Sequence, residues 1–116
     1  IENGVDLTRF ATAASPYRMF PQAVVLARNV RDVPQVLAYG HTHSIPVTFR
    51  AAGTSLSGQS QGDGILVEVM RHWIGCTVEE GGRVLRSKPG TILARANAAL
   101  KPHGFRLGPD PASKTA

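Results

Sequence analysis

Three short runs of apolar residues divide the first part of the chain, and each has the length of one buried strand. They are rich in β-branched and aliphatic side chains and are bounded by glycine, proline or polar residues, as is typical of strands covered on both faces. The runs are Ala23–Ala27, Ile45–Phe49 and Ile65–Val69. We therefore predict three strands before residue 70.

Two other segments show helical spacing. In Asp32–His43, residues at i, i+3, i+4 and i+7 form one packing face, namely Val33, Val36, Leu37 and Gly40. Asn29 and Asp32 resemble a capping box ahead of this helix. In Thr91–Leu100 the shared face consists of Ile92, Leu93, Ala96 and Leu100. We predict that Thr91 caps this second helix and that Pro102 and Gly104 end it.

A β-hairpin is predicted between the last strand and the second helix. Trp73–Glu79 and Arg83–Ser87 are β-like segments that flank Glu80-Gly81-Gly82, a turn sequence. The final segment, Leu107–Ala116, is rich in proline and glycine and predicts a rigid extended turn. The order of elements predicts one compact α+β unit, in which a small mixed β-sheet carries packed helices.

The stretch between the second and third strands is composed of small and polar residues that do not build a core. Glycine admits backbone angles that let a ligand approach the main chain, and consecutive N–H groups form a nest for phosphate oxygens. Hydroxyl groups add donors, and an arginine adds a fixed positive charge. The stretch comprises Arg50, Ala51, Ala52, Gly53, Thr54, Ser55, Leu56, Ser57, Gly58 and Gln59. It predicts a phosphate or pyrophosphate cradle, and composition alone favours a plain polar surface loop equally.

Other nucleotide and catalytic patterns are missing from the sequence. Gly-x-Gly-x-x-Gly does not occur, and Gln59 follows Gly58 where a P-loop needs lysine. His41 and His43 point in different directions on a helix, so they do not chelate one metal together. We predict no catalytic residue and no metal ligand in this chain.

Charge and cysteine content bear on the partners and the location to be expected of the protein. The net charge is +5, but the basic residues are scattered singly and aromatic residues make up only 6% of the chain, so we expect no nucleic-acid partner. No apolar run approaches the ~20 residues of a membrane span. The single cysteine, Cys76, excludes an internal disulfide and fits a reducing compartment, so we expect a cytoplasmic protein.

Several segments together resemble a known family. Residues 50–59, Arg-Ala-Ala-Gly-Thr-Ser-Leu-Ser-Gly-Gln, are similar to the pyrophosphate loop of FAD-linked oxidoreductases of the vanillyl-alcohol oxidase and p-cresol methylhydroxylase (PCMH) type, in the D-lactate dehydrogenase and glycolate oxidase branch. The resemblance extends over nearly the whole chain. It includes Tyr17-Arg18 with Pro21–Val25, Ile45-Pro46-Val47, Lys88–Thr91 and Leu107–Thr115.

The resemblance implies a role for each of these segments. Ala52–Gln59 would hold the FAD pyrophosphate, and Pro46 and Val47 would lie near the adenine. Pro109, Asp110 and Ser113 would lie near the middle or the isoalloxazine side of the cofactor. FAD would carry the redox chemistry while the protein orients it. Some relatives attach the flavin through a histidine in this loop, and Thr54 stands at that place, which implies non-covalent FAD.

The resemblance also implies that residues 1–116 are the first part of a PCMH-type FAD domain. Ala13 departs from the branch, which often has aspartate at that place. A second flavin-binding segment and the substrate domain are expected outside the chain. The leading hypothesis is a flavin-dependent oxidoreductase of a small 2-hydroxy acid such as D-lactate or glycolate. The alternative is a non-catalytic anion-binding or interaction module. By itself the chain is expected to be inactive, to bind FAD weakly or not at all, and to associate with itself.

Overall fold

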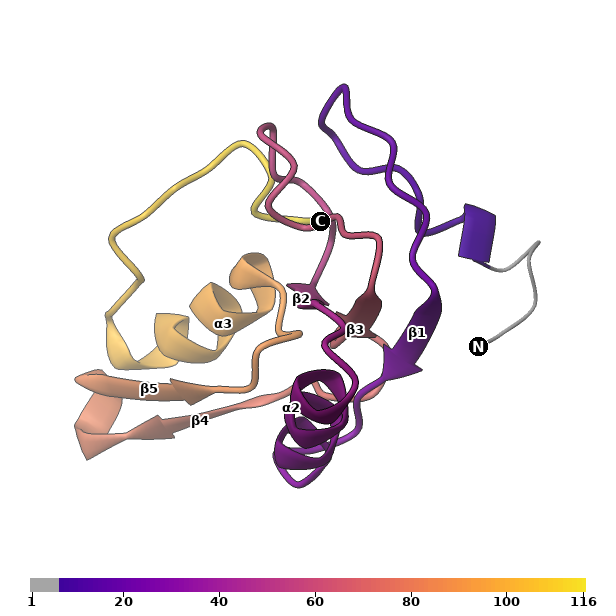
Figure 1. Cartoon of the computed structure of the whole chain (residues 1–116). Helices are drawn as coiled ribbons and strands as arrows, with labels where there is room; N and C mark the ends of the chain where they lie inside the picture. Colours follow the sequence, from indigo (N-terminus) through magenta and orange to yellow (C-terminus); the bar gives the residue numbers. More distant parts are fainter. Residues whose placement is uncertain (1–6) are drawn as a thin grey trace.

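The structure is a computed structural model that describes residues 7–116. The first three strands and one helix lie on one side of the molecule, and a hairpin with a second helix lies on the other (Figure 1). The FAD domain expected from the sequence begins at residue 1, and its residues 1–6 lie outside the described residues. The elements are β1 (Ala23–Leu26), α2 (Asp32–Thr42), β2 (Val47–Arg50), β3 (Ile65–Glu68), β4 (Cys76–Glu79), β5 (Val84–Ser87) and α3 (Leu93–Leu100), with short 3-10 turns at Glu80–Gly82 and Lys101–His103.

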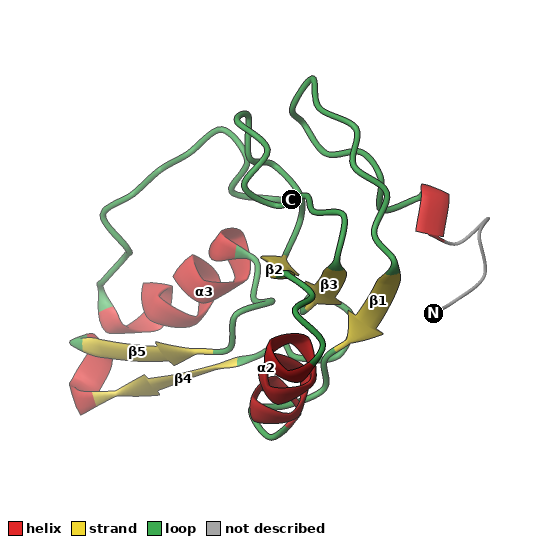
Figure 2. Cartoon of the chain, viewed as in Figure 1, coloured by secondary structure: helices red, strands yellow, loops and turns green. Residues whose placement is uncertain are grey.

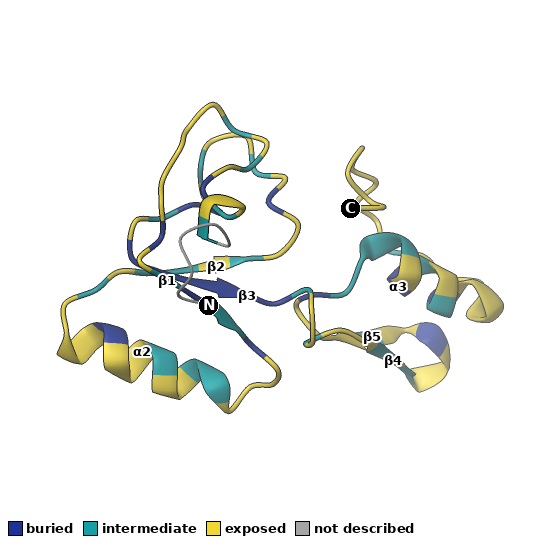
Figure 3. Cartoon of the chain, turned by 90° about the vertical axis from the view of Figure 1, so that its right-hand side faces the viewer, coloured by how far each residue is buried: buried dark blue, intermediate teal, exposed yellow. Residues whose placement is uncertain are grey.

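The first sheet has three parallel strands in the order β1-β3-β2, with β3 in the centre. Helix α2 covers one face, and two long loops cover the opposite face (Figure 3). All four residues of β3 are buried, as expected for a central strand covered on both faces. The pattern of three apolar runs therefore predicted this sheet correctly.

The face toward α2 holds the main apolar core. Ile65, Val67 and Val69 are buried there, and Val36 of α2 packs against them. Helix and strand approach closely at Gly40, where a Cβ atom would lie 2.6 Å from Cγ2 of Val47. A larger residue would force a shift of the Val47 side chain and of the Ile45 carbonyl, which would lie 2.8 Å from that Cβ.

The antiparallel strands form a separate two-stranded sheet. β4 and β5 pair through the register Cys76 with Ser87 and Glu79 with Val84, and α3 packs beside them. Figure 2 shows this hairpin apart from the three parallel strands. The α+β class is confirmed, and the structure adds that the parallel and antiparallel pairings occupy two sheets.

Only half of the predicted capping box forms at the start of α2: Asp32 bonds back to the preceding backbone, but the N-cap residue is Arg31 and no side chain caps the helix. Oδ2 of Asp32 accepts hydrogen bonds from the backbone N–H of Arg28 at 2.7 Å and of Asn29 at 3.2 Å. These bonds favour the charged carboxylate and hold the pKa of Asp32 below its ordinary value. The start of α3 differs from the prediction, because the Thr91 hydroxyl bonds to Gly75 in the hairpin and caps no helical N–H.

Asp32→Asn should therefore lower the melting temperature at neutral pH and leave it unchanged in acid. Because the folded-state pKa is depressed, the stabilisation is present above the unfolded pKa and is lost as pH falls through the folded value. Thermal melts of both proteins between about pH 2 and pH 7 should converge at the acid end, a window set by the ordinary aspartate pKa of about 3.9. A constant difference at every pH would contradict this assignment.

No helix among residues 7–116 is long and apolar enough to cross a bilayer.

Candidate functional site

Residues 51–64 connect the carboxyl end of β2 to β3 without a helix, and the site lies in their first part, residues 51–60. We call this first part the cofactor loop. It rises from the sheet face opposite α2 (Figure 3). The expectation that no helix runs through Gly53–Gln59 is confirmed. On its way back to β3 the chain runs close to β2, because a Cβ atom at Gly62 would lie 2.5 Å from Oγ1 of Thr48.

Two glycines in the cofactor loop have backbone angles that other residues rarely adopt. Gly53 has a φ of +69° and Gly58 a φ of +80°. An added Cβ atom would lie 2.7 Å from Nη2 of Arg50 at Gly53 and 3.0 Å from Cδ2 of Tyr17 at Gly58, so these side chains would have to shift. The loop shape therefore depends on glycine at both places.

The cofactor loop leaves a continuous set of hydrogen-bond donors unused. Within residues 7–116, none of the backbone N–H groups from residue 51 to residue 60 donates a hydrogen bond to the protein. The hydroxyls of Thr54, Ser55 and Ser57 also have no protein partner in this part of the chain. Free N–H groups next to positive-φ glycines suit the oxygens of a bound phosphate or pyrophosphate. The residues present therefore fit the pyrophosphate of FAD.

Arg50 places a positive charge directly beneath the loop. Its Nη1 donates to the carbonyl of Phe10 at 3.1 Å, its guanidinium lies 5.8 Å from the Phe10 ring centre, and it packs against Gly53. Burial lowers the pKa of Arg50, and the charge of Glu68 opposes this shift. An arginine remains charged at neutral pH in this setting. The structure therefore brings the predicted cation to the loop.

Two residues just beyond the predicted stretch belong to the same site. Gln61 is only 5% exposed, and its side chain bonds to the N-terminal segment. Ser60 is also buried, and its Oγ has no hydrogen-bond partner among the described residues. Sequence reasoning missed both, because a polar residue in a Gly/Ser-rich stretch gives no sign of burial.

Pro46 and Val47 lie at the amino end of β2, away from the start of the loop. The Val47 side chain packs between β2 and α2, on the face opposite the loop. Pro46 is exposed, and its carbonyl accepts the N–H of Ile65 at 2.9 Å. The contact of these two residues with adenine stays a prediction. Because the Val47 side chain packs against α2, only the backbone of Val47 could make such a contact on the loop side.

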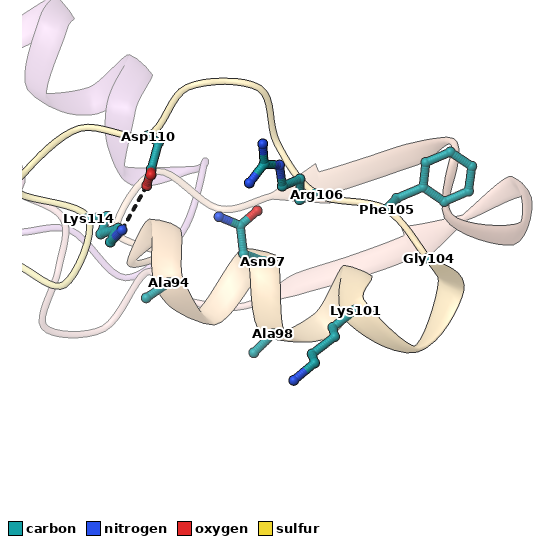
Figure 4. Close-up of a pocket in the computed structure, with 9 residues that line it drawn as sticks. All are labelled: Ala94, Asn97, Ala98, Lys101, Gly104, Phe105, Arg106, Asp110 and Lys114. Atoms are coloured by element: carbon teal, nitrogen blue, oxygen red, sulfur yellow. Dashed lines mark hydrogen bonds and ion pairs between the residues drawn. The ribbon is translucent and has the colours of Figure 1, made fainter.

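Pro109, Asp110 and Ser113 are exposed on the C-terminal segment beside α3. Asp110 forms an ion pair with Lys114 at 2.9 Å, and both line a cavity of about 610 Å³ against α3 (Figure 4). The hydrogen bond from Lys114 holds the pKa of Asp110 below its ordinary value. Among the described residues, no hydrogen bond or ion pair joins Pro109, Asp110 or Ser113 to the cofactor loop, and their predicted contacts with FAD stay predictions.

No three His, Cys, Asp or Glu side chains within residues 7–116 are arranged to hold a metal ion.

The parallel sheet and the donor-rich loop define an α+β domain whose loop geometry suits an anionic ligand. Residues 21–116 match the FAD binding domain family, and the chain belongs to that family. This membership favours the flavin hypothesis over a general anion-binding module.

Curated relatives share most of this chain. It is 38% identical over 109 residues to a D-2-hydroxyglutarate dehydrogenase of Pseudomonas putida, which covers 89% of the chain and 11% of that protein. It is 35% identical over 104 residues to the glycolate oxidase subunit GlcD of Escherichia coli, which covers 88% of the chain and 21% of that subunit. The resemblance to the glycolate oxidase branch is confirmed. The chain spans between a tenth and about a fifth of the length of these relatives.

Proposed function

We propose that residues 1–116 are the first part of the FAD domain of a flavin-dependent oxidoreductase that acts on a small 2-hydroxy acid. A second flavin-binding segment and a substrate domain belong to the same enzyme and lie outside this sequence. The observation that carries the proposal is the row of backbone N–H groups from residue 51 to residue 60, which donate no hydrogen bond within residues 7–116 and lie beside two positive-φ glycines. Relatives named for D-2-hydroxyglutarate and for glycolate, both 2-hydroxy acids, support the substrate class.

The cofactor loop would hold the pyrophosphate of FAD. Backbone N–H groups and the hydroxyls of Thr54, Ser55 and Ser57 would donate to its oxygens, and Arg50 would offset its charge from below the loop. When bound, FAD would supply the oxidising chemistry, the removal of a hydride from the α-carbon of the hydroxy acid. The contribution of this chain is binding and orientation. It carries no proposed catalytic residue, and the isolated chain should be inactive.

Titration of the 15N-labelled chain with ADP and with FAD tests this proposal. ADP carries the pyrophosphate without the flavin ring, so both ligands should shift the amide signals of residues 51–60. Because the flavin ring would have little protein around it, FAD should bind little more tightly than ADP and more weakly than micromolar. Signals that shift elsewhere, or not at all, would overturn the loop assignment. Sub-micromolar FAD binding would show that this chain alone carries the whole site.

Non-covalent attachment follows from Thr54, since threonine forms no bond to the flavin of the kind that histidine forms. We expect acid precipitation of the flavin-loaded enzyme to release all of its flavin into the supernatant. Yellow colour retained on the washed polypeptide would contradict this expectation.

Self-association of the isolated chain is also expected. Large apolar side chains are exposed on several elements, including Phe49 at 42%, Tyr39 at 55% and Phe105 at 46%. Exposed apolar surface of this extent favours contact between copies. Light scattering after gel filtration should give a mass that rises with protein concentration, and a monomer at every concentration would contradict this. For the enzyme itself we propose the cytoplasm, a location that the lone, half-buried Cys76 supports.

A further inference from the structure

The segment from residue 11 to residue 17, here called the arm, lies against the cofactor loop. The backbone N–H of Ala14 donates to the carbonyl of Gly53 at 2.9 Å. The Tyr17 ring lies against Gly58 so closely that a Cβ atom there would be 3.0 Å from Cδ2 of Tyr17. The arm therefore contacts both glycines whose positive φ angles shape the loop.

Gln61 fastens the arm to the base of the loop. Its Nε2 donates to the carbonyl of Ala11 at 2.9 Å and to the carbonyl of Tyr17 at 2.8 Å, and its Oε1 accepts from the hydroxyl of Ser15. The amide thus engages both donor hydrogens and its oxygen, at 5% exposure. One side chain holds the arm at its start, middle and end.

The loop has little else to hold its shape. Within residues 7–116, only two backbone hydrogen bonds reach residues 51–60, from Ala14 to Gly53 and from the Gln61 N–H to the carbonyl of Gly58. Both come from the arm or from Gln61. A loop with so few internal bonds samples many conformations unless such contacts restrict it.

We propose that Gln61 is a positioning residue, which holds the arm against the cofactor loop so that the loop is ordered for pyrophosphate before the ligand arrives. The inference rests on the proposed function. Ordering the loop in advance removes part of the entropic cost of binding, so the ligand binds more tightly. By linkage, a ligand on the loop must stabilise the docked arm by the same factor.

The test compares three variants of the full chain with the unaltered protein. Gln61→Met removes the amide and nearly preserves length and volume. Ser15→Ala removes only the donor to Oε1. Gln22→Met is the matched control, because Gln22 also donates to a distant backbone carbonyl, that of Asp63 at 3.0 Å, and no described contact joins it to the arm or to residues 51–60. The measurements are the ADP affinity by amide shifts, the melting temperature, and the rate of tryptic cleavage after the exposed Arg18.

We expect Gln61→Met to weaken ADP binding about fivefold to tenfold, within the range of ordinary coupling energies, and Ser15→Ala to weaken it less. Gln22→Met should bind ADP normally. Saturating ADP should slow cleavage after Arg18 in the unaltered chain and in Gln22→Met, and should have no effect on that rate in Gln61→Met.

Two results would overturn the inference, and they differ from failure of the proposed function. If Gln61→Met melts earlier but binds ADP as the unaltered chain does, Gln61 has a structural role only. If ADP protects Arg18 equally in all variants, the arm and the loop are not coupled through Gln61. Should Gln61→Met fail to fold, Ser15→Ala decides by the same two criteria. An unaltered chain that does not bind ADP would instead overturn the proposed function, and this inference with it.

Discussion

Replacing Gly53 with alanine is expected to weaken binding of ADP or FAD to the chain by tenfold or more. At a φ of +69° an alanine costs about 1–2 kcal/mol of backbone strain. Its Cβ would also lie 2.7 Å from Nη2 of Arg50, so the guanidinium must shift under the loop. Hydrogen bonds to charged groups contribute about 1.5–3 kcal/mol each, and every 1.4 kcal/mol is a factor of ten in affinity.

Gly104→Ala is the matched control for Gly53→Ala. Gly104 has a similar φ of +75°, but a Cβ there meets no atom within 4 Å, and the residue lies after α3, away from the loop. Both variants place alanine at a positive φ angle, so their melting temperatures should fall by similar amounts. Only Gly53→Ala should lose affinity in an ADP titration. Equal affinities would show that the conformation at Gly53 does not govern binding.

The strands were predictable from the sequence because burial on both faces leaves uninterrupted apolar runs. The central strand β3 lies within its predicted range, Ile65–Val69, and β2 begins two residues later than predicted. The shift has a local cause. The N–H of Ile45 donates to Gly40 at the end of α2, and Pro46 has no N–H to donate. Ladder pairing therefore starts at Val47.

The separation into two sheets could not be derived from the pattern of residues. Hairpin β4-β5 has the alternation and turn glycines of any hairpin, whether it joins the parallel strands or lies apart from them. Thr91 illustrates the same limit on a smaller scale. Its position favoured a helix cap, but its hydroxyl bonds to both the N–H and the carbonyl of Gly75, and this tertiary contact replaces the local one.

The site was predictable only in its chemistry. Composition and resemblance identified the donor-rich loop and Arg50, because small residues, hydroxyls and glycines are visible in the sequence. The support for the loop was not visible, since it depends on contacts between residues far apart in the chain, such as Gln61 with Ala11 and Arg50 with Phe10. The roles predicted for Pro109, Asp110 and Ser113 depend on where the C-terminal segment lies, and it lies beside α3.

Arg50→Met should have the other large effect, a loss of ADP affinity of tenfold or more together with a lower melting temperature. The substitution removes the charge beneath the loop and leaves the Phe10 carbonyl without its donor. A half-buried cation is screened less than an exposed one, so its attraction for a pyrophosphate persists at physiological ionic strength. Arg50→Lys keeps the charge but loses the planar guanidinium, so its ADP affinity should lie between those of the unaltered chain and Arg50→Met.

Arg86→Met is the control with the same change in net charge. Arg86 is 77% exposed in its side chain and pairs with Glu79 on the hairpin, and an exposed pair of this kind contributes little to stability. If long-range charge alone attracted the ligand, both variants would weaken ADP binding equally at low salt. Their shared loss of affinity relative to the unaltered chain would then vanish as salt increases. If the position of the charge matters, Arg50→Met should remain much weaker than Arg86→Met in titrations at both low and high salt. Equal affinities of these two variants would exclude a direct role for Arg50 at the pyrophosphate.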